Sequence, residues 1–153
     1  FRIEFVAPYP FIYGQSINNT SIDVFEGGGA TLPAELPLSM GVGGEGLAGV
    51  NNIGNANAYL NIRIDGGIQN PSIINITTDE SFSLLYDLPA GEYIEIDTYN
   101  RTVMLNGVTN ALQYFSGDWL TFAPGINQIK LTGTNETVTA GATITWKEHY
   151  LGI

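Results

Sequence analysis

The sequence has no cysteine, a single histidine and few positive charges. Without cysteine, the chain can form no disulfide, no thiolate metal site and no cysteine nucleophile. The only histidine is His149, which excludes a site built from several histidines. Lysine and arginine together number 5 against 15 aspartates and glutamates, so the net charge is -10. Such a surface repels nucleic acids and anionic membranes, and both are excluded as partners.

Long apolar runs and charged side chains are also scarce. No run reaches the 18 or more apolar residues that a membrane-spanning helix needs. Charged residues make up 13% of the chain, against about 25% in typical domains. Neutral polar residues take their place, which suits packing against neighbouring subunits or exposure on an extracellular protein or a virion. The length of 153 residues predicts one domain over residues 1–153. Because the first residue is Phe1, we expect this domain to be part of a longer protein.

Alternation of apolar and polar residues is the dominant pattern. In residues 59–65, the side chains of Leu60, Ile62 and Ile64 share one face. Residues 72–78 place Ile74 and Ile76 together, and we expect that face to be buried. Side chains of a strand point alternately to its two faces, so each pattern predicts one buried face and one polar face. Further strands are predicted over residues 2–6, 21–25, 81–86, 92–98, 101–106, 126–132 and 142–148.

Turn residues separate these strands at short intervals. Residues 99–100 predict a tight hairpin, and Asn106-Gly107 supplies residues that tolerate positive φ. Pro71 is expected at the start of the strand over residues 72–78, where a missing N–H does no harm. A single helical turn is predicted within residues 109–115, and a long loop over residues 27–49. Many short strands with regular turns favour an antiparallel β-sandwich, a jelly roll or a barrel.

Several segments, in order, resemble the C-terminal domain of phage distal tail proteins, the Dit family of siphovirus tail components. The matching segments are EFVAPYP at 4–10, NIGNANAY at 52–59, GIQNPSI at 67–73, LPAGE at 88–92, RTVMLNG at 101–107, PGINQI at 124–129 and ATITWKEHYL at 142–151. No single segment is specific, but their order and spacing cover essentially the whole chain.

This resemblance implies an all-β antiparallel sandwich of the galectin-like or carbohydrate-module-like jelly-roll type. It implies a structural role at the tail tip of the virion, between the tail tube and the host-recognition apparatus. The N-terminal half that closes the family's ring, generally a hexamer, is missing from this sequence. We therefore expect a hexameric ring for the full-length protein, whereas this domain alone can be monomeric.

Residues able to carry catalysis are few. A serine triad would need His149, which we expect on the surface near the end of the last strand, and no GxSxG elbow is present. Asp79-Glu80 and the pair Glu95 and Asp97 could in principle support glycoside hydrolysis or hold calcium. Acidic residues in loops are more often merely solvated, so we predict no catalytic residues, no metal and no cofactor.

Aromatic residues near predicted turns leave one alternative open. Sugars stack on exposed aromatic rings, and polar side chains bond their hydroxyl groups. A contiguous exposed aromatic patch would therefore indicate a binding surface. The candidates for glycan or protein contact are Tyr9, Phe11, Tyr13, Tyr99, Tyr114, Phe115 and Trp119. The leading hypothesis is a virion structural protein that contacts other tail proteins. The alternatives are a module that binds the host cell-wall glycan and a secreted lectin-like domain.

Overall fold

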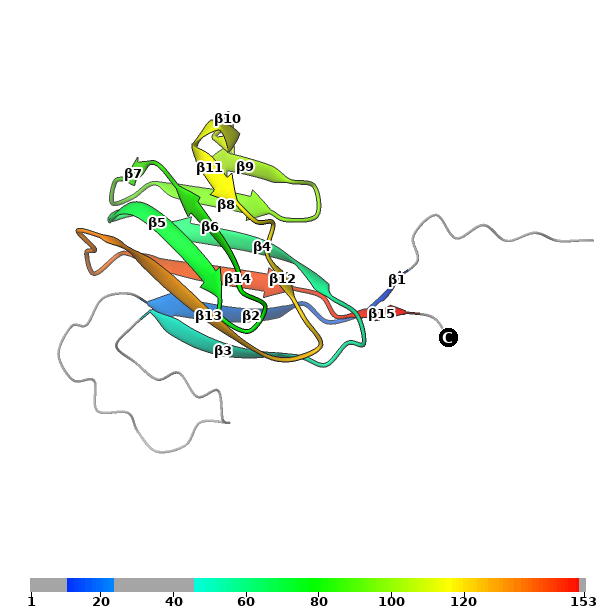
Figure 1. Ribbon diagram of the computed structural model, residues 1–153. Helices are drawn as coiled ribbons and strands as arrows, with labels where there is room; N and C mark the ends of the chain where they lie inside the picture. The colour runs from blue at the N-terminus through cyan, green and yellow to red at the C-terminus, as the bar shows by residue number, and fades with distance from the viewer. Residues whose placement is uncertain (1–10, 24–45, 152–153) are drawn as a thin grey trace, which may run out of the picture.

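The computed structural model describes residues 11–23 and 46–151, which are built almost entirely of β-strands (Figure 1). The strands are β1 (Phe11–Tyr13), β2 (Asn18–Asp23), β3 (Leu47–Asn52), β4 (Ala58–Asp65), β5 (Ile68–Asn75), β6 (Glu80–Leu84), β7 (Asp87–Leu88), β8 (Tyr93–Asp97), β9 (Thr102–Leu105), β10 (Thr109–Asn110), β11 (Phe115–Gly117), β12 (Thr121–Phe122), β13 (Gly125–Thr134), β14 (Gly141–Trp146) and β15 (His149–Leu151). The predicted helical turn is confirmed as a 3₁₀ helix, η1 (Leu112–Tyr114). Within the described ranges, no helix could cross a membrane.

The strands form two large sheets and a short ribbon, and every pairing is antiparallel. The seven-stranded sheet runs β10-β9-β8-β4-β14-β2, with β12 beside β4. The six-stranded sheet runs β11-β6-β5-β13-β3, with β7 beside β5. Strands β1 and β15 pair with each other and extend from one end of the body (Figure 1). The predicted all-β antiparallel architecture is therefore confirmed, while the finer likeness to galectins stays a prediction.

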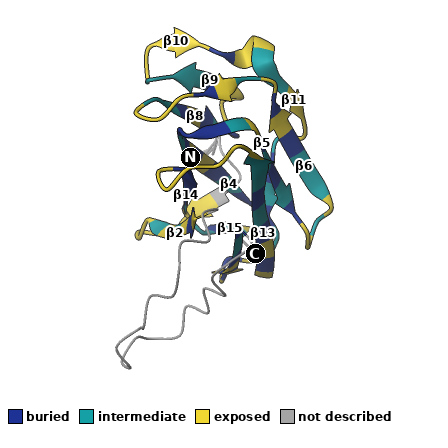
Figure 2. Cartoon of the chain, turned by 90° about the vertical axis from the view of Figure 1, so that its left-hand side faces the viewer, coloured by how far each residue is buried: buried dark blue, intermediate teal, exposed yellow. Residues whose placement is uncertain are grey.

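One hydrophobic core lies between the two large sheets. The seven-stranded sheet contributes Ile62 and Ile144, and the six-stranded sheet contributes Ile73 and Ile129, all at most 1% exposed. Figure 2 shows these buried segments along β4, β5, β13 and β14, with exposed residues at β10 and the turns. The inward side chains alternate with outward polar ones, as expected for a sheet with one face covered.

Trp146 belongs to this core and is 6% exposed. Its indole ring meets Phe122 edge to face at 5.1 Å between ring centroids. The indole Nε1 is buried and has no hydrogen-bond partner among the described residues. Packing rather than hydrogen bonding therefore holds this ring in place.

Strand β5 corrects two predictions. Its buried face carries Ile73 and Asn75, whereas Ile74 is half-buried and Ile76 is 49% exposed. The prediction failed because hydropathy treats asparagine as a polar residue that belongs on the exposed face. The Asn75 amide makes hydrogen bonds inside the protein, and these bonds remove the cost of burying it. Its Nδ2 donates to the Thr121 carbonyl (2.9 Å) and to Asn127 Oδ1 (3.2 Å).

Pro71 lies inside β5 rather than at its start, because the strand begins at Ile68. Asn70 adopts a left-handed φ of 47°, and the pairing of β5 with β13 shifts register between Thr132 and Thr134. Such a bulge interrupts the ladder, and a residue without an N–H is tolerated there.

The predicted turns are largely confirmed. The hairpin predicted at residues 99–100 does join β8 to β9, but its loop is longer and covers residues 98–101, because the last strand pair is Asp97 with Thr102. Asn106 and Gly107 have φ values of 51° and 70°. The predicted loop 27–49 ends too late, because β3 already begins at Leu47, and residues 24–45 lie outside the described part of the chain. The strand predicted over residues 2–6 also lies outside it. The one predicted over 21–25 is described only to residue 23, as part of β2.

Candidate functional site

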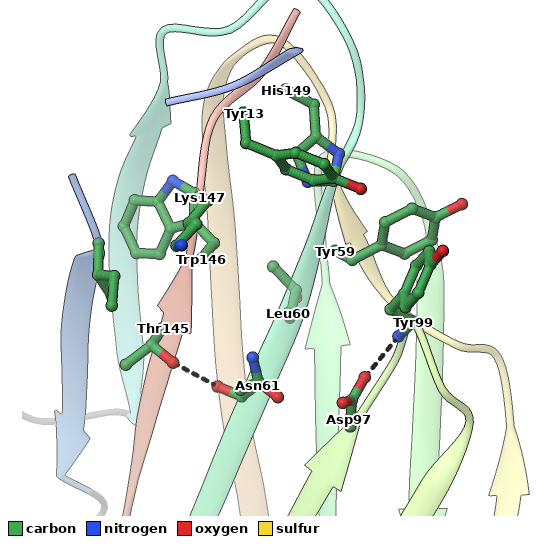
Figure 3. A pocket seen from close by; sticks show the side chains of 11 residues that line it. Tyr13, Tyr59, Leu60, Asn61, Asp97, Tyr99, Thr145, Trp146, Lys147 and His149 are labelled. Atoms are coloured by element: carbon green, nitrogen blue, oxygen red, sulfur yellow. Dashed lines mark hydrogen bonds between the residues drawn. The ribbon is translucent and has the colours of Figure 1, made fainter. Parts of the chain in front are cut away.

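A hollow of about 260 Å³ lies where the β1–β15 ribbon meets the end of the seven-stranded sheet (Figure 3). Its wall is aromatic, and its floor is made of short polar side chains from β4, β8 and β14. The main lining residues are Tyr13, Tyr59, Asn61, Tyr99, Thr145 and His149. Sequence segments far apart in the chain thus converge on one surface.

His149 fixes the ribbon to the sandwich. It pairs with Tyr13 across the ribbon, and the two rings meet edge to face at 4.8 Å between centroids. Its Nδ1 lies 2.9 Å from the Asn57 carbonyl oxygen, which can only accept, so Nδ1 carries the proton. Only 3% of the residue is exposed, which corrects the prediction of a surface histidine. Burial lowers the pKa of His149, and the hydrogen bond to Asn57 opposes this only in part.

Tyr99 stands at the tip of the β8–β9 hairpin, 46% exposed. Its ring meets that of Tyr59 at 5.0 Å between centroids, with 69° between the two planes. The Asp97 carboxylate accepts hydrogen bonds from the backbone N–H groups of Tyr99 (2.9 Å) and Asn100 (2.8 Å). Asp97 therefore shapes the turn that presents Tyr99, an arrangement typical of an Asx-turn.

Asn61, Asp97 and Thr145 form a single row across three strands. Strand register places Asn61 opposite both Thr145 on β14 and Asp97 on β8. The Asn61 side chain is exposed, and its amide makes no hydrogen bond to any described residue. A second hollow shares these three residues and continues toward Thr102 and Met104. We call the two hollows together the sheet groove.

The seven aromatic residues predicted as contact candidates divide into separate groups. Tyr13 and Tyr99 line the sheet groove. Tyr114, Phe115 and Trp119 do not: they are partly buried against the core, near the β11 edge of the six-stranded sheet. There the rings of Phe115 and Trp119 stack at 4.3 Å. Tyr9 lies outside the described residues, and Phe11 is described only as backbone of β1.

Of the six main lining residues of the first hollow, four were not predicted as contact residues: Tyr59, Asn61, Thr145 and His149. Alternation along residues 59–65 and 142–148 places Asn61 and Thr145 on the faces opposite the apolar side chains. Their meeting depends on the register between strands, since the Thr145 hydroxyl bonds the Asn61 carbonyl at 3.4 Å across 84 residues of sequence. A single sequence does not specify that register.

The comparisons with known proteins agree on one family. The family model described as siphovirus-type tail component, C-terminal domain, matches residues 53–150. No curated protein matches the sequence.

Among the solved structures, a phage protein is similar over most of the chain. It is the SPP1 Dit (gp 19.1) protein, described as a paradigm of the hub adsorption apparatus in phages that infect Gram-positive bacteria. The TM-score is 0.65, the sequences are 14% identical, and the match covers 94% of this chain and 50% of that one. The present chain thus spans about half the length of that protein, and the likeness shows a shared fold. Because the family model covers most of the chain, the predicted resemblance is confirmed: the chain belongs to the siphovirus-type tail component family, as its C-terminal domain.

Proposed function

We propose that this chain is the C-terminal domain of a distal tail protein, at the tail tip of a phage virion. In this position it links the tail tube to the host-recognition apparatus, as a structural part without catalytic activity. The observation that carries the proposal is the family match over residues 53–150. The similarity to a Dit protein over nearly all of the chain supports the same fold assignment.

The two outer faces of the sandwich differ in a way that suits this role. On the side of the six-stranded sheet, Ile126 of β13 is 72% exposed and Ile74 of β5 is half-buried, while Ile76 in the turn after β5 is 49% exposed. Exposed apolar side chains of this kind favour contact with another protein. We propose that neighbouring tail proteins pack on this side, and that the full-length protein forms a hexameric ring.

Electron microscopy of labelled virions tests the proposal. Antibodies raised against this domain should label only the tip of the tail, and mass spectrometry of purified virions should detect its peptides. Deleting the gene should leave tails without an organised tip. Label on the capsid, or virions that lack the protein and still carry complete tips, would contradict the assignment.

A second candidate function is binding of the host cell-wall glycan. The observation that favours it is the meeting of Tyr13, Tyr59 and Tyr99 beside the polar row of the sheet groove (Figure 3). Aromatic rings next to amide and hydroxyl groups form the mixed surface that sugar recognition requires.

A further inference from the structure

We infer that the sheet groove binds a neutral oligosaccharide, which rests against Tyr59 and Tyr99 and extends over Asn61 and Thr145 toward Thr102. This inference rests on the second candidate function above and gives it a location and a ligand class. It assigns binding to the outer face of the seven-stranded sheet and not to the aromatic cluster around Trp119.

The polar row and the adjoining hollow supply hydrogen-bonding groups that the fold leaves unused. The exposed Asn61 amide offers donors and an acceptor and bonds no described residue. Thr143 and Thr102 carry hydroxyl groups in the adjoining hollow, each with no side-chain hydrogen bond among the described residues. Amides and hydroxyls can both donate and accept, and this matches the dual character of sugar hydroxyl groups.

The dimensions of the groove favour a chain of sugars over a single one. The groove crosses four adjacent strands in the order β14, β4, β8 and β9. Three spacings of about 4.8 Å give a track about 14 Å long. Asn and Thr are short side chains, so a ligand can lie close to the sheet along this track.

The aromatic end of the groove provides an apolar platform. Tyr99 is 46% exposed, and its position is fixed by the Asp97 hydrogen bonds at the base of the turn. Tyr59 braces it from the side at 5.0 Å between ring centroids. A ring held in this way loses little conformational freedom on binding, which favours affinity.

Charge distinguishes a neutral ligand from an anionic one. The charged residues that line the sheet groove are Lys147, Arg63, Asp97 and Glu95, two of each sign. Arg63 is already paired with Asp65 at 2.9 Å. Because the chain has a net charge of -10, its overall field repels an anionic polymer such as poly(glycerol phosphate).

The same face is poorly suited to a protein partner. Of the large apolar side chains exposed in the described part of the chain, only Tyr13, Ile17 and Tyr99 line the groove. The centre of a protein interface usually needs a larger desolvated apolar patch. Ile126 lies on the other sheet, and Ile76 lies in the turn that follows strand β5 of that sheet.

Binding to defined sugars tests the inference. The 153-residue chain is screened on an array of neutral oligosaccharides, and the best binder is titrated by NMR, with poly(glycerol phosphate) as the anionic comparator. We expect a Kd in the millimolar range or tighter, with shift changes at Asn61 and Thr145. Tyr99→Ala and Asn61→Ala should each raise Kd about tenfold, the loss of about 1.4 kcal/mol of contact.

Matched controls come from the rest of the surface. Asn51→Ala removes an exposed asparagine from β3 of the other sheet, and Tyr150→Ala removes a tyrosine that does not line the groove. Both should leave Kd unchanged. If Tyr99→Ala lowers the melting temperature, the result for Asn61→Ala decides. The Asn61 side chain makes no hydrogen bond to the described residues, so removing it should leave the fold intact.

Three results would overturn the inference. They are no binding to any neutral oligosaccharide, equal weakening by the control variants, and tighter binding of poly(glycerol phosphate). None of these results bears on the location of the protein in the virion, which antibody labelling measures separately. A failure of sugar binding is therefore distinguishable from a failure of the structural assignment.

Discussion

Asn127 offers a sharp test of how buried polar side chains hold this fold together. The residue is fully buried, and its side chain makes four hydrogen bonds. Oδ1 accepts from the Ala123 N–H (3.0 Å) and from Asn75 Nδ2 (3.2 Å). Nδ2 donates to the carbonyls of Ala123 (2.8 Å) and Gly125 (3.1 Å). The side chain thus fixes the turn between β12 and β13 and connects it to β5.

Replacing Asn127 with alanine removes all four bonds and takes these partners away from the partly buried backbone groups of Ala123 and Gly125. At about 1 kcal/mol for each bond, the free energy of unfolding falls by about 4 kcal/mol. This is a large part of the roughly 5–15 kcal/mol that stabilises a typical domain. For a chain of this size, the melting temperature should fall by roughly 8–16 °C.

Urea denaturation followed by circular dichroism measures the change. Gln128→Ala is the matched control, because its side chain is exposed and makes no hydrogen bond to the described residues; its effect should stay below about 0.5 kcal/mol. Asn127→Asp keeps the acceptors and loses both amide donors. Burial raises the pKa of a carboxyl group. The free energy of unfolding of this variant should therefore lie further below that of the wild type at neutral pH than at about pH 4. A loss below about 1 kcal/mol for Asn127→Ala would refute the reasoning.

Three further predictions concern other parts of the structure. Burial depresses the pKa of His149 below its ordinary value of 6.5, so its contribution to stability is present above that pH and is lost as the pH falls below it. The difference in urea midpoint between the wild type and His149→Gln should therefore shrink between about pH 7.5 and about pH 5.5, and a constant difference would argue against this role. A Cβ on Gly66 would lie 1.8 Å from a backbone carbonyl oxygen of the neighbouring loop, whereas one on Gly49 would meet nothing within 4 Å. Thermal denaturation should show a loss above about 2 kcal/mol for Gly66→Ala and none for Gly49→Ala, and similar values for both would contradict the close approach of that carbonyl. The Arg63 guanidinium lies 3.7 Å from the ring centroid of Tyr93 on an exposed face, so a double-mutant cycle should give a coupling of at most about 1 kcal/mol, and a value above about 2 kcal/mol would show a stronger contact.

The alternation of side chains was sufficient to predict most of the core. In β4 and β14 the apolar positions are also the buried positions, so pattern and structure agree. In β5 apolar residues occur on both faces, and alternation selected the wrong one. The inward face there includes Asn75, whose burial depends on a hydrogen bond to a residue 52 positions away. Local pattern carries no information about such a partner.

The sheet groove was predictable only in part, for a similar reason. Tyr13 and Tyr99 were recognised as aromatic residues near turns, and both line the groove. Tyr114 and Trp119 satisfied the same criterion and yet pack against the core. Whether an aromatic ring near a turn is covered depends on which strand lies beside it. That choice is made by contacts across sheets, which a single sequence does not reveal.

The β1–β15 ribbon has a mechanical consequence. Phe11 and Leu151 lie opposite each other at its outer end, while Tyr13 and His149 lie at its base. The segment before β4 contacts β15 at both ends of the ribbon. Ala56 bridges to His149 at the base, and the Asn55 side chain accepts a hydrogen bond from the Leu151 N–H (2.6 Å) at the outer end. A tether of two hydrogen-bonded strands resists bending and twisting better than a single strand. The orientation of the ribbon relative to the sandwich is thus set by two neighbouring residues, Asn55 and Ala56, together with the buried imidazole of His149.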